Sequence, residues 1–282
     1  SGTEAALLYL YHLAAAEGEM IERMLDEAII IVDPLLNPDG RDRFADWANR
    51  NRGGVHNADP QDREHLEAWP GGRTNHYWFA LNRDWLLVQH PESQGRADVF
   101  HHWRPQVLTD HHEMGGNATF FFMPGIPSRN NPITPERNFE LTAALADYHA
   151  RGLDAVGALY YARESFDDFY YGKGSTYPDA NGAVGILFEQ GSSRALERET
   201  VNGNLHYSTT VQNQFVTSLT TLEGSVELRE DLLAYYRNFY ATSSDVARSS
   251  TNKAYVVSLS EDRTRAQALA QLLQQHRIKL FG

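Results

Sequence analysis

The sequence predicts an α/β protein whose sheet is mixed, largely parallel and twisted, with helices on both faces. Residues 28–32 form a continuous apolar run rich in β-branched side chains, which is typical of a strand covered on both faces. A helical pattern precedes this run, and a second apolar strand follows much later, at residues 183–189. Helix followed by buried strand is the alternation from which largely parallel or mixed sheets are built.

The N-terminal part of the chain is expected to form two helices and then the first strand. Thr3 can cap a helix that runs to about residue 15, and a second helical segment covers residues 20–25. The strand at residues 28–32 should end at Asp33-Pro34, because proline cannot donate to a ladder. Residues 36–75 are polar without sustained periodicity, so they are expected to form a long excursion outside the sheet, where function is often found.

The middle of the chain continues the alternation of strands and helices. Strands are expected at residues 107–113 and 119–123, followed by a helix from about Pro135 through His149. From residue 205 to residue 248 apolar side chains recur at helical spacing, as expected of helices that pack on the core.

The C-terminal residues predict a separate small unit after a polar break. Residues 254–259 and 278–281 have strand patterns, and residues 262–275 between them have a helical one. Because such a β-α-β unit needs more strands to bury its faces, we divide the chain into a main domain over residues 1–248 and the beginning of a second α/β domain, or a C-terminal extension, over residues 249–282.

Composition excludes several classes of protein. The formal net charge of -12 argues against a general nucleic-acid binder, which needs basic surface to neutralise phosphates. The chain has no cysteine, so any metal must be held by His, Asp or Glu. It also has no apolar run long enough to predict a membrane span.

Metal-competent side chains gather at the end of the strand expected at residues 107–113. Asp110, His111, His112 and Glu113 follow one another directly there. Because side chains alternate along a strand, Asp110 and His112 should share one face while His111 takes the other. This placement favours metal binding by His112, with a cluster of loop-facing histidines as the alternative.

Two further segments carry chemistry that suits a metal site. Glu189 ends the apolar strand at residues 183–189, and a carboxylate there is costly to bury unless a cation or a reacting water compensates it. This is the profile of a general base. Asn82-Arg83 offers an amide beside a guanidinium, which together suit a carboxylate ligand, with a structural salt bridge as the alternative.

Taken in order, these elements resemble the zinc carboxypeptidase family. The series consists of a strand followed by Asn-Pro-Asp-Gly at residues 37–40, an arginine-rich segment after Trp47, Asn-Arg-Asp-Trp at residues 82–85, the strand-end His112, a tyrosine loop at residues 167–174 and the strand-end Glu189. Each motif is short, but their common order is hard to obtain by chance. The resemblance covers roughly residues 1–240.

The resemblance implies a metallocarboxypeptidase that uses one zinc ion and acts on peptides with a free C-terminus. His112 would be a zinc ligand and Glu189 the general base and acid. Tyr171 would be the phenol that closes over the substrate, and Asn82 and Arg83 would hold the C-terminal carboxylate.

The same resemblance implies an arginine that polarises the scissile carbonyl and stabilises the oxyanion. The spacing from Trp47 leaves both Arg52 and Arg50 open, with Arg52 favoured and Arg50 then contacting the substrate. Tyr170 is the alternative to Tyr171, because the tyrosine loop departs mildly from the family's pattern.

One departure bears on the metal. The family supplies its first two zinc ligands as His-x-x-Glu just before the helix that here begins near Thr3, and this sequence contains no His-x-x-Glu. The chain is therefore expected to be a fragment that binds zinc weakly or not at all. The resemblance also favours a periplasmic or extracellular location, with any signal segment outside this chain.

Two alternatives remain open from the sequence. One is an amidohydrolase that deacylates small amino-acid derivatives, since Asn82-Arg83 suits any substrate with a carboxylate. The other is a non-catalytic peptide-binding module of the same fold. A His-x-x-Glu shortly before Ser1 in a longer chain would favour an enzyme, and its absence would favour the binding module.

Overall fold

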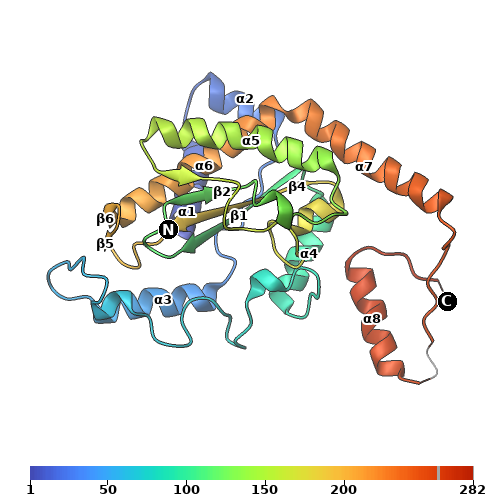
Figure 1. Ribbon diagram of the computed structural model, residues 1–282, viewed down its shortest axis with the longest axis horizontal. Coiled ribbons are helices and arrows are strands. Elements are labelled where there is room, and N and C mark those ends of the chain that lie inside the picture. The colour runs from blue at the N-terminus through green and yellow to red at the C-terminus, as the bar shows by residue number, and fades with distance from the viewer. Residues whose placement is uncertain (259–260, 282) are drawn as a thin grey trace.

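The computed structural model describes residues 1–258 and 261–281, and within them the central sheet is four-stranded and mixed (Figure 1). Its strands are β1 (Val107–Met114), β2 (Phe120–Phe122), β3 (Tyr160–Tyr161) and β4 (Val184–Gly191), in the order β1-β4-β2-β3. β1 pairs with β4 in parallel, β4 with β2 in antiparallel, and β2 with β3 in parallel. The predicted class is confirmed, as are the strands expected at residues 107–113, 119–123 and 183–189.

Helices cover both faces of this sheet. The helices within the described residues are α1 (Gly2–Ala15), α2 (Glu19–Glu27), α3 (Pro38–Asn51), α4 (Pro91–Trp103), α5 (Glu136–Ala155), α6 (Tyr207–Glu227), α7 (Arg229–Ser249) and α8 (Arg263–Gln275). Figure 1 shows α5 and α6 on one side of the sheet, with α3 and α4 on the other. On the first side, His111 of β1 contacts Gln214 of α6. On the second side, Leu108 of β1 packs on the cluster that contains Phe100 of α4.

The main core lies between the sheet and α5. Phe120, Phe121, Ile186 and Phe188 are completely buried, and Leu145 of α5 packs with them. The apolar run of β4 up to Phe188 follows from this environment, because a central strand with helices or loops on both faces has no solvent side. A second cluster joins α1 and α2 to α6.

The strand expected at residues 28–32 does not form. Within the described residues this segment has no ladder partner, and Ile29 and Ile31 are 77% and 48% exposed. A strand exists only as part of a ladder, since each lone strand leaves its N–H and C=O groups unpaired. The apolar pattern identified a segment suited to a sheet, but no neighbouring strand pairs with it here.

The expectation of an irregular excursion over residues 36–75 is also wrong in its first part, which forms α3. Asn37 caps this helix by accepting a hydrogen bond from the Gly40 N–H at 3.1 Å. Pro38 occupies the first turn, where its missing N–H costs nothing. Asn-Pro-Asp-Gly is thus a helix start, which the low apolar content of the helix concealed. The rest of the excursion contains only short turns and one short 3-10 helix, Arg63–His65.

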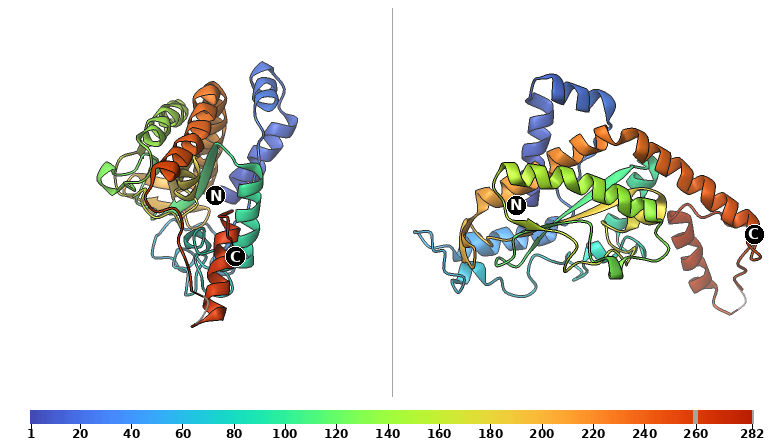
Figure 2. Two further views of the ribbon diagram at one scale, coloured as in Figure 1. Left: turned by 90° about the vertical axis from the view of Figure 1, so that its right-hand side faces the viewer. Right: turned by 45° about the horizontal axis from the view of Figure 1, so that its top comes forward.

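The expected C-terminal β-α-β unit is reduced to its helix. α8 agrees with the prediction, but residues 254–258 and 278–281 form no strand, and residue 259 lies outside the described residues. α8 lies beside α4 (Figure 2). His276, just after α8, contacts the Tyr177 hydroxyl at 2.7 Å. α7 extends through Ser249, so the division at residue 248 stays a prediction.

Some elements were not anticipated at all. They include α4 and the hairpin of β5 (Glu197–Thr200) and β6 (Gly203–His206). Every helix within residues 1–258 and 261–281 is too short or too polar to cross a membrane.

Candidate active site

Two of the predicted site residues, His112 and Glu189, lie side by side near the carboxyl ends of neighbouring parallel strands. β1 and β4 pair in a register that sets His112 opposite Glu189. In a parallel ladder, register partners present their side chains to the same face of the sheet. The crevice at the carboxyl ends of strands is also where open α/β sheets bind ligands.

His112 is held by a polar network on its own face of β1. The Asp110 Oδ1 lies 2.6 Å from the His112 Nε2, so the two side chains share a face as predicted from strand alternation. The amide of Asn82 lies 2.8 Å from both the Asp110 Oδ2 and the His112 Nε2. His111 points the opposite way and contacts Gln214 at 2.8 Å.

The charges in this network favour ionised Asp110 and protonated His112. Burial opposes ionisation of Asp110, but His112 and the hydrogen bonds outweigh it and lower the pKa of Asp110. Burial likewise opposes protonation of His112, and the Asp110 carboxylate overcomes it and raises the pKa of His112. Burial raises the pKa of Glu189, and Asp110 adds to this shift while His112 opposes it.

We expect Asp110→Ala to lower the free energy of unfolding by about 3–5 kcal/mol near pH 6, the usual cost of breaking a buried ion pair. The contribution of His112 is present at low pH and is lost as the pH rises through its raised folded pKa. The contribution of Asp110, whose folded pKa is lowered, is present above its unfolded pKa of about 4. Urea unfolding near pH 6 and near pH 9 should therefore show a smaller effect at the higher pH. An equal effect at both values would mean that charge does not hold the network together.

Asn82 and Arg83 are adjacent, but their side chains have different hydrogen-bond partners. The amide of Asn82 is fully engaged, because its Oδ1 also accepts the Gly174 N–H at 2.7 Å. Asn82 therefore orients Asp110 and His112. Arg83 is exposed, and among the described residues its guanidinium donates only from Nη1 to the Asn82 carbonyl oxygen, at 2.7 Å, so its other donors can bind an anion.

In the tyrosine loop, the hydroxyls of Tyr170 and Tyr171 contact different parts of the chain. The Tyr171 hydroxyl contacts the Thr134 hydroxyl at 3.0 Å, and neither Tyr170 nor Tyr171 lines the cavity described below. The Tyr170 hydroxyl donates to the Arg83 carbonyl oxygen at 3.3 Å, and its ring lies against Gly172. In this conformation Tyr170 is the tyrosine that lies nearer to Arg83.

The arginines after Trp47 are also separated by the structure. Arg50 is exposed on α3 and pairs with Asp46 at 2.7 Å. Arg52, just beyond the end of α3, lines the same cavity as His112 and Glu189.

Arg73 is a cation of the site that the sequence analysis missed. It lines the same cavity, and its charge acts on both His112 and Glu189. The signal available in the sequence was the pair Gly71-Gly72 before it, which allows the backbone to approach α3 closely.

A cavity of about 1350 Å³ contains the site. It extends along β1 and is bounded on the far side by residues 28–36. β4 occupies one edge of β1, and the other edge has no strand partner within the described residues. The free edge of β1 and residues 28–32, which have no ladder partner, therefore border the same cavity.

The residues around His112 do not by themselves complete a three-ligand metal site. In the described part of the chain, only Asp39, His76 and Glu92 bring three His or carboxylate ligand atoms within 4.8 Å of one another. Catalytic zinc needs three protein ligands. The Asp110 carboxylate is the one acidic group bonded to His112. These residues therefore fit a zinc ion only in part.

Comparison with solved structures identifies the fold. The chain is similar to a metallo-carboxypeptidase from Burkholderia cenocepacia, with a TM-score of 0.54 and 14% identity over 78% of this chain and 52% of the other. A carboxypeptidase from Burkholderia mallei gives a TM-score of 0.55 and 16% identity, covering 79% and 53%. A Pseudomonas aeruginosa metallo-carboxypeptidase, in complex with (2-guanidinoethylmercapto)succinic acid, gives 0.55 and 14%, covering 81% and 54%.

The chain therefore has the α/β fold of the metallo-carboxypeptidases, as the sequence resemblance implied. It spans about half the length of these structures. The sequence itself matches no family model and no curated protein.

Proposed function

We propose that this protein is part of a zinc-dependent metallopeptidase that removes C-terminal residues from peptides. The observation that carries the proposal is the pairing of His112 with Glu189 at the carboxyl ends of β1 and β4, inside a cavity that Arg52, Arg73 and Arg83 also line. A carboxylate beside an imidazole provides acid-base chemistry, and the arginines provide anion recognition.

In this proposal Glu189 takes the proton of the attacking water and returns it to the leaving amine. Burial raises its pKa, which brings the carboxylate nearer to the range in which a general base works at neutral pH. His112 is a metal ligand whose ring is oriented by Asp110 and Asn82. Arg52 or Arg73 stabilises the oxyanion, because both guanidinium groups reach the cavity.

Arg83 binds the C-terminal carboxylate, with Asn82 supporting the site rather than touching the substrate. The free guanidinium of Arg83 and the engaged amide of Asn82 support this division. The tyrosine that covers the substrate is Tyr170, or Tyr171 after a movement of the loop that breaks its contact with Thr134.

The remaining zinc ligands come, in this proposal, from residues outside the described chain. The free edge of β1 and the extended residues 28–32 bound a cavity that an added strand would fill. Such a strand would end close to His112. The 282-residue chain alone should therefore hold zinc weakly at His112.

The proposal is tested by comparing a peptide that has a free C-terminal carboxylate with its amidated form. We expect the acid to bind to the chain at least about tenfold more tightly, because a charge-assisted hydrogen bond contributes about 1.5–3 kcal/mol. Arg83→Gln should remove this difference, whereas the exposed Arg50→Gln should retain it. Fluorescence anisotropy of labelled peptides measures the binding without requiring catalysis. Equal binding of acid and amide would contradict the exopeptidase proposal.

A non-catalytic peptide-binding module of the same fold is the second candidate, favoured by the incomplete ligand set around His112. Both candidates predict carboxylate-dependent binding. Only the enzyme predicts release of the C-terminal residue, so mass spectrometry of peptides incubated with zinc and with the intact protein separates the two.

A further inference from the structure

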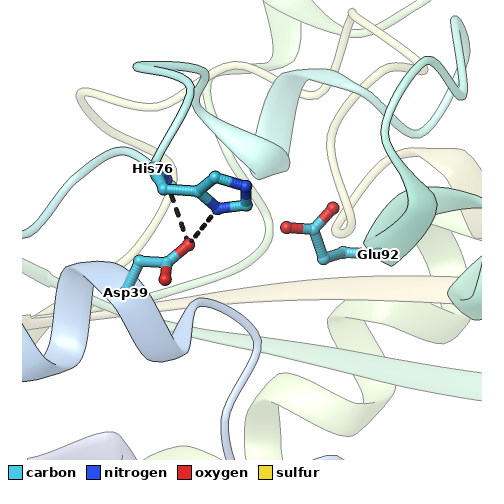
Figure 3. A group of neighbouring side chains, drawn as sticks. All are labelled: Asp39, His76 and Glu92. Carbon is cyan, nitrogen blue, oxygen red and sulfur yellow. Dashed lines mark hydrogen bonds and ion pairs between the residues drawn. The ribbon is translucent and has the colours of Figure 1, made fainter.

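Asp39, His76 and Glu92 form a cluster that the proposed peptidase chemistry does not use. Each offers one ligand atom, and these atoms lie within 4.8 Å of one another. Figure 3 shows the imidazole of His76 between the two carboxylates. The three side chains come from α3, from the loop before residue 82 and from α4, so the cluster ties together segments that are distant in sequence. None of the three lines the cavity that contains His112 and Glu189.

The loop that carries His76 is anchored to its surroundings. The Asn75 side chain is buried, and its Oδ1 accepts the N–H groups of Tyr77 and Phe79, at 3.0 and 3.1 Å. Arg43 of α3 donates to the Gly71 carbonyl oxygen at 2.9 Å and also bonds the Thr74 carbonyl oxygen. This anchoring presents His76 in a fixed position, as a ligand site requires.

The two carboxylates sit in the first turns of their helices. Asp39 follows Pro38 at the start of α3, and Glu92 follows Pro91 at the start of α4. The Asp39 Oδ2 accepts both the backbone N–H of His76 at 3.0 Å and its Nδ1 at 2.7 Å. Within the described residues the Glu92 carboxylate has no hydrogen bond or ion pair, although it faces His76. The cluster therefore has one satisfied carboxylate, whereas the other acts on Arg96 through its charge alone and forms no hydrogen bond or ion pair among the described residues.

We propose that Asp39, His76 and Glu92 bind a divalent transition-metal ion of the zinc type, at a site separate from the one that contains His112. One imidazole and two carboxylates form a nitrogen and oxygen ligand set that suits zinc and leaves a fourth position for water. Two negative charges balance the charge of the ion. By bridging α3, the loop and α4, the metal would hold in place the segment between the two helices, which carries Arg73 and Arg83.

The test measures zinc binding to the metal-free 282-residue chain by calorimetry, with His76→Ala compared against His102→Ala. His102 is an exposed histidine at the end of α4 and serves as the matched control. Loss of an outer partner of a metal ligand costs 10–100-fold in affinity, so loss of a ligand should cost about 100-fold or more. We expect that loss for His76→Ala, and no change in the affinity of this site for His102→Ala or His112→Ala.

Further variants and ions make the result decisive. Glu92→Gln, which keeps shape and leaves the loop intact, removes a charged ligand and should also weaken zinc binding by about 100-fold or more. Zinc should raise the Tm of the wild-type protein but not that of Glu92→Gln, whose metal-free Tm should equal that of the wild type. Magnesium and calcium, which prefer sites made of oxygen ligands alone, should bind poorly.

Two outcomes would overturn the proposal. Zinc binding that survives His76→Ala and disappears with His112→Ala would place the metal at the peptidase site instead. No zinc binding, together with a His76 proton that NMR finds shared between Asp39 and Glu92, would make the cluster a proton-bridged structural contact. The carboxylate-dependent peptide binding proposed above is unaffected by either outcome, so the two proposals fail separately.

Discussion

Glu189→Gln should abolish peptide hydrolysis while making the folded chain more stable. Removing a general base costs about 10²–10⁴-fold in kcat. The stability gain follows from the raised pKa of Glu189, because a group whose pKa is raised by folding disfavours the folded state once it ionises. A neutral glutamine avoids that cost at pH 7, and active-site replacements of this kind commonly add about 0.5–2 kcal/mol.

The two halves of this prediction need different measurements. Hydrolysis is followed by mass spectrometry in the protein that contains all of its zinc ligands. Stability is followed by urea unfolding of the 282-residue chain, near pH 7 and near pH 4, where the wild-type carboxyl is protonated and the variants should converge. Unchanged hydrolysis would remove Glu189 from the mechanism. A variant less stable than the wild type at pH 7 would show that the contact with His112 outweighs burial.

Phe188→Ala should lower the free energy of unfolding by about 3–5 kcal/mol, which is usual for removing a buried phenylalanine. Phe188 is completely buried on β4, between β1 and β2. Its ring packs on those of His111, Phe120 and His149, at centroid distances of 4.8, 5.9 and 4.9 Å. Because the pairing of β1 with β4 sets His112 opposite Glu189, loosening β4 should also impair peptide binding.

Phe281→Ala is the matched control for this substitution. Phe281 is 91% exposed, so its removal should change the free energy of unfolding by less than about 0.5 kcal/mol. Chemical denaturation of both variants gives the comparison. Similar midpoints for the two would mean that the interior of the sheet does not hold the fold together.

The local sequence predicted a helix or strand correctly where the pattern of the segment itself determined its structure. β1 was predicted from the extended pattern of residues 106–109, and β4 from its apolar run up to Phe188. α1 and α5 were predicted because their apolar residues recur at helical spacing. The polar α3 escaped prediction because its low apolar content concealed the helix start at Asn37-Pro38, and because its contacts with the loop at residues 71–76 are not local.

The candidate site was predictable to the extent that it depends on strand geometry. That Asp110 and His112 share a face follows from alternation alone. The position of Glu189 opposite His112 required the register of two strands that are about 75 residues apart in sequence. Three other features depend on loops, whose paths are set by contacts between distant segments. They are the hydrogen bonds of Asn82, the contact of Tyr171 with Thr134 and the position of Arg73 near Glu189.

By itself, the sequence determined the α/β class, most of the sheet and the identity of its two central chemical groups, because side-chain periodicity and burial act over a few residues. Only the tertiary structure decided that residues 28–32 have no strand partner within the described residues. It also decided that Asp39, His76 and Glu92 meet elsewhere. Pairing and ligand geometry are long-range properties, fixed by which segments pack together and not by the preferences of any one of them.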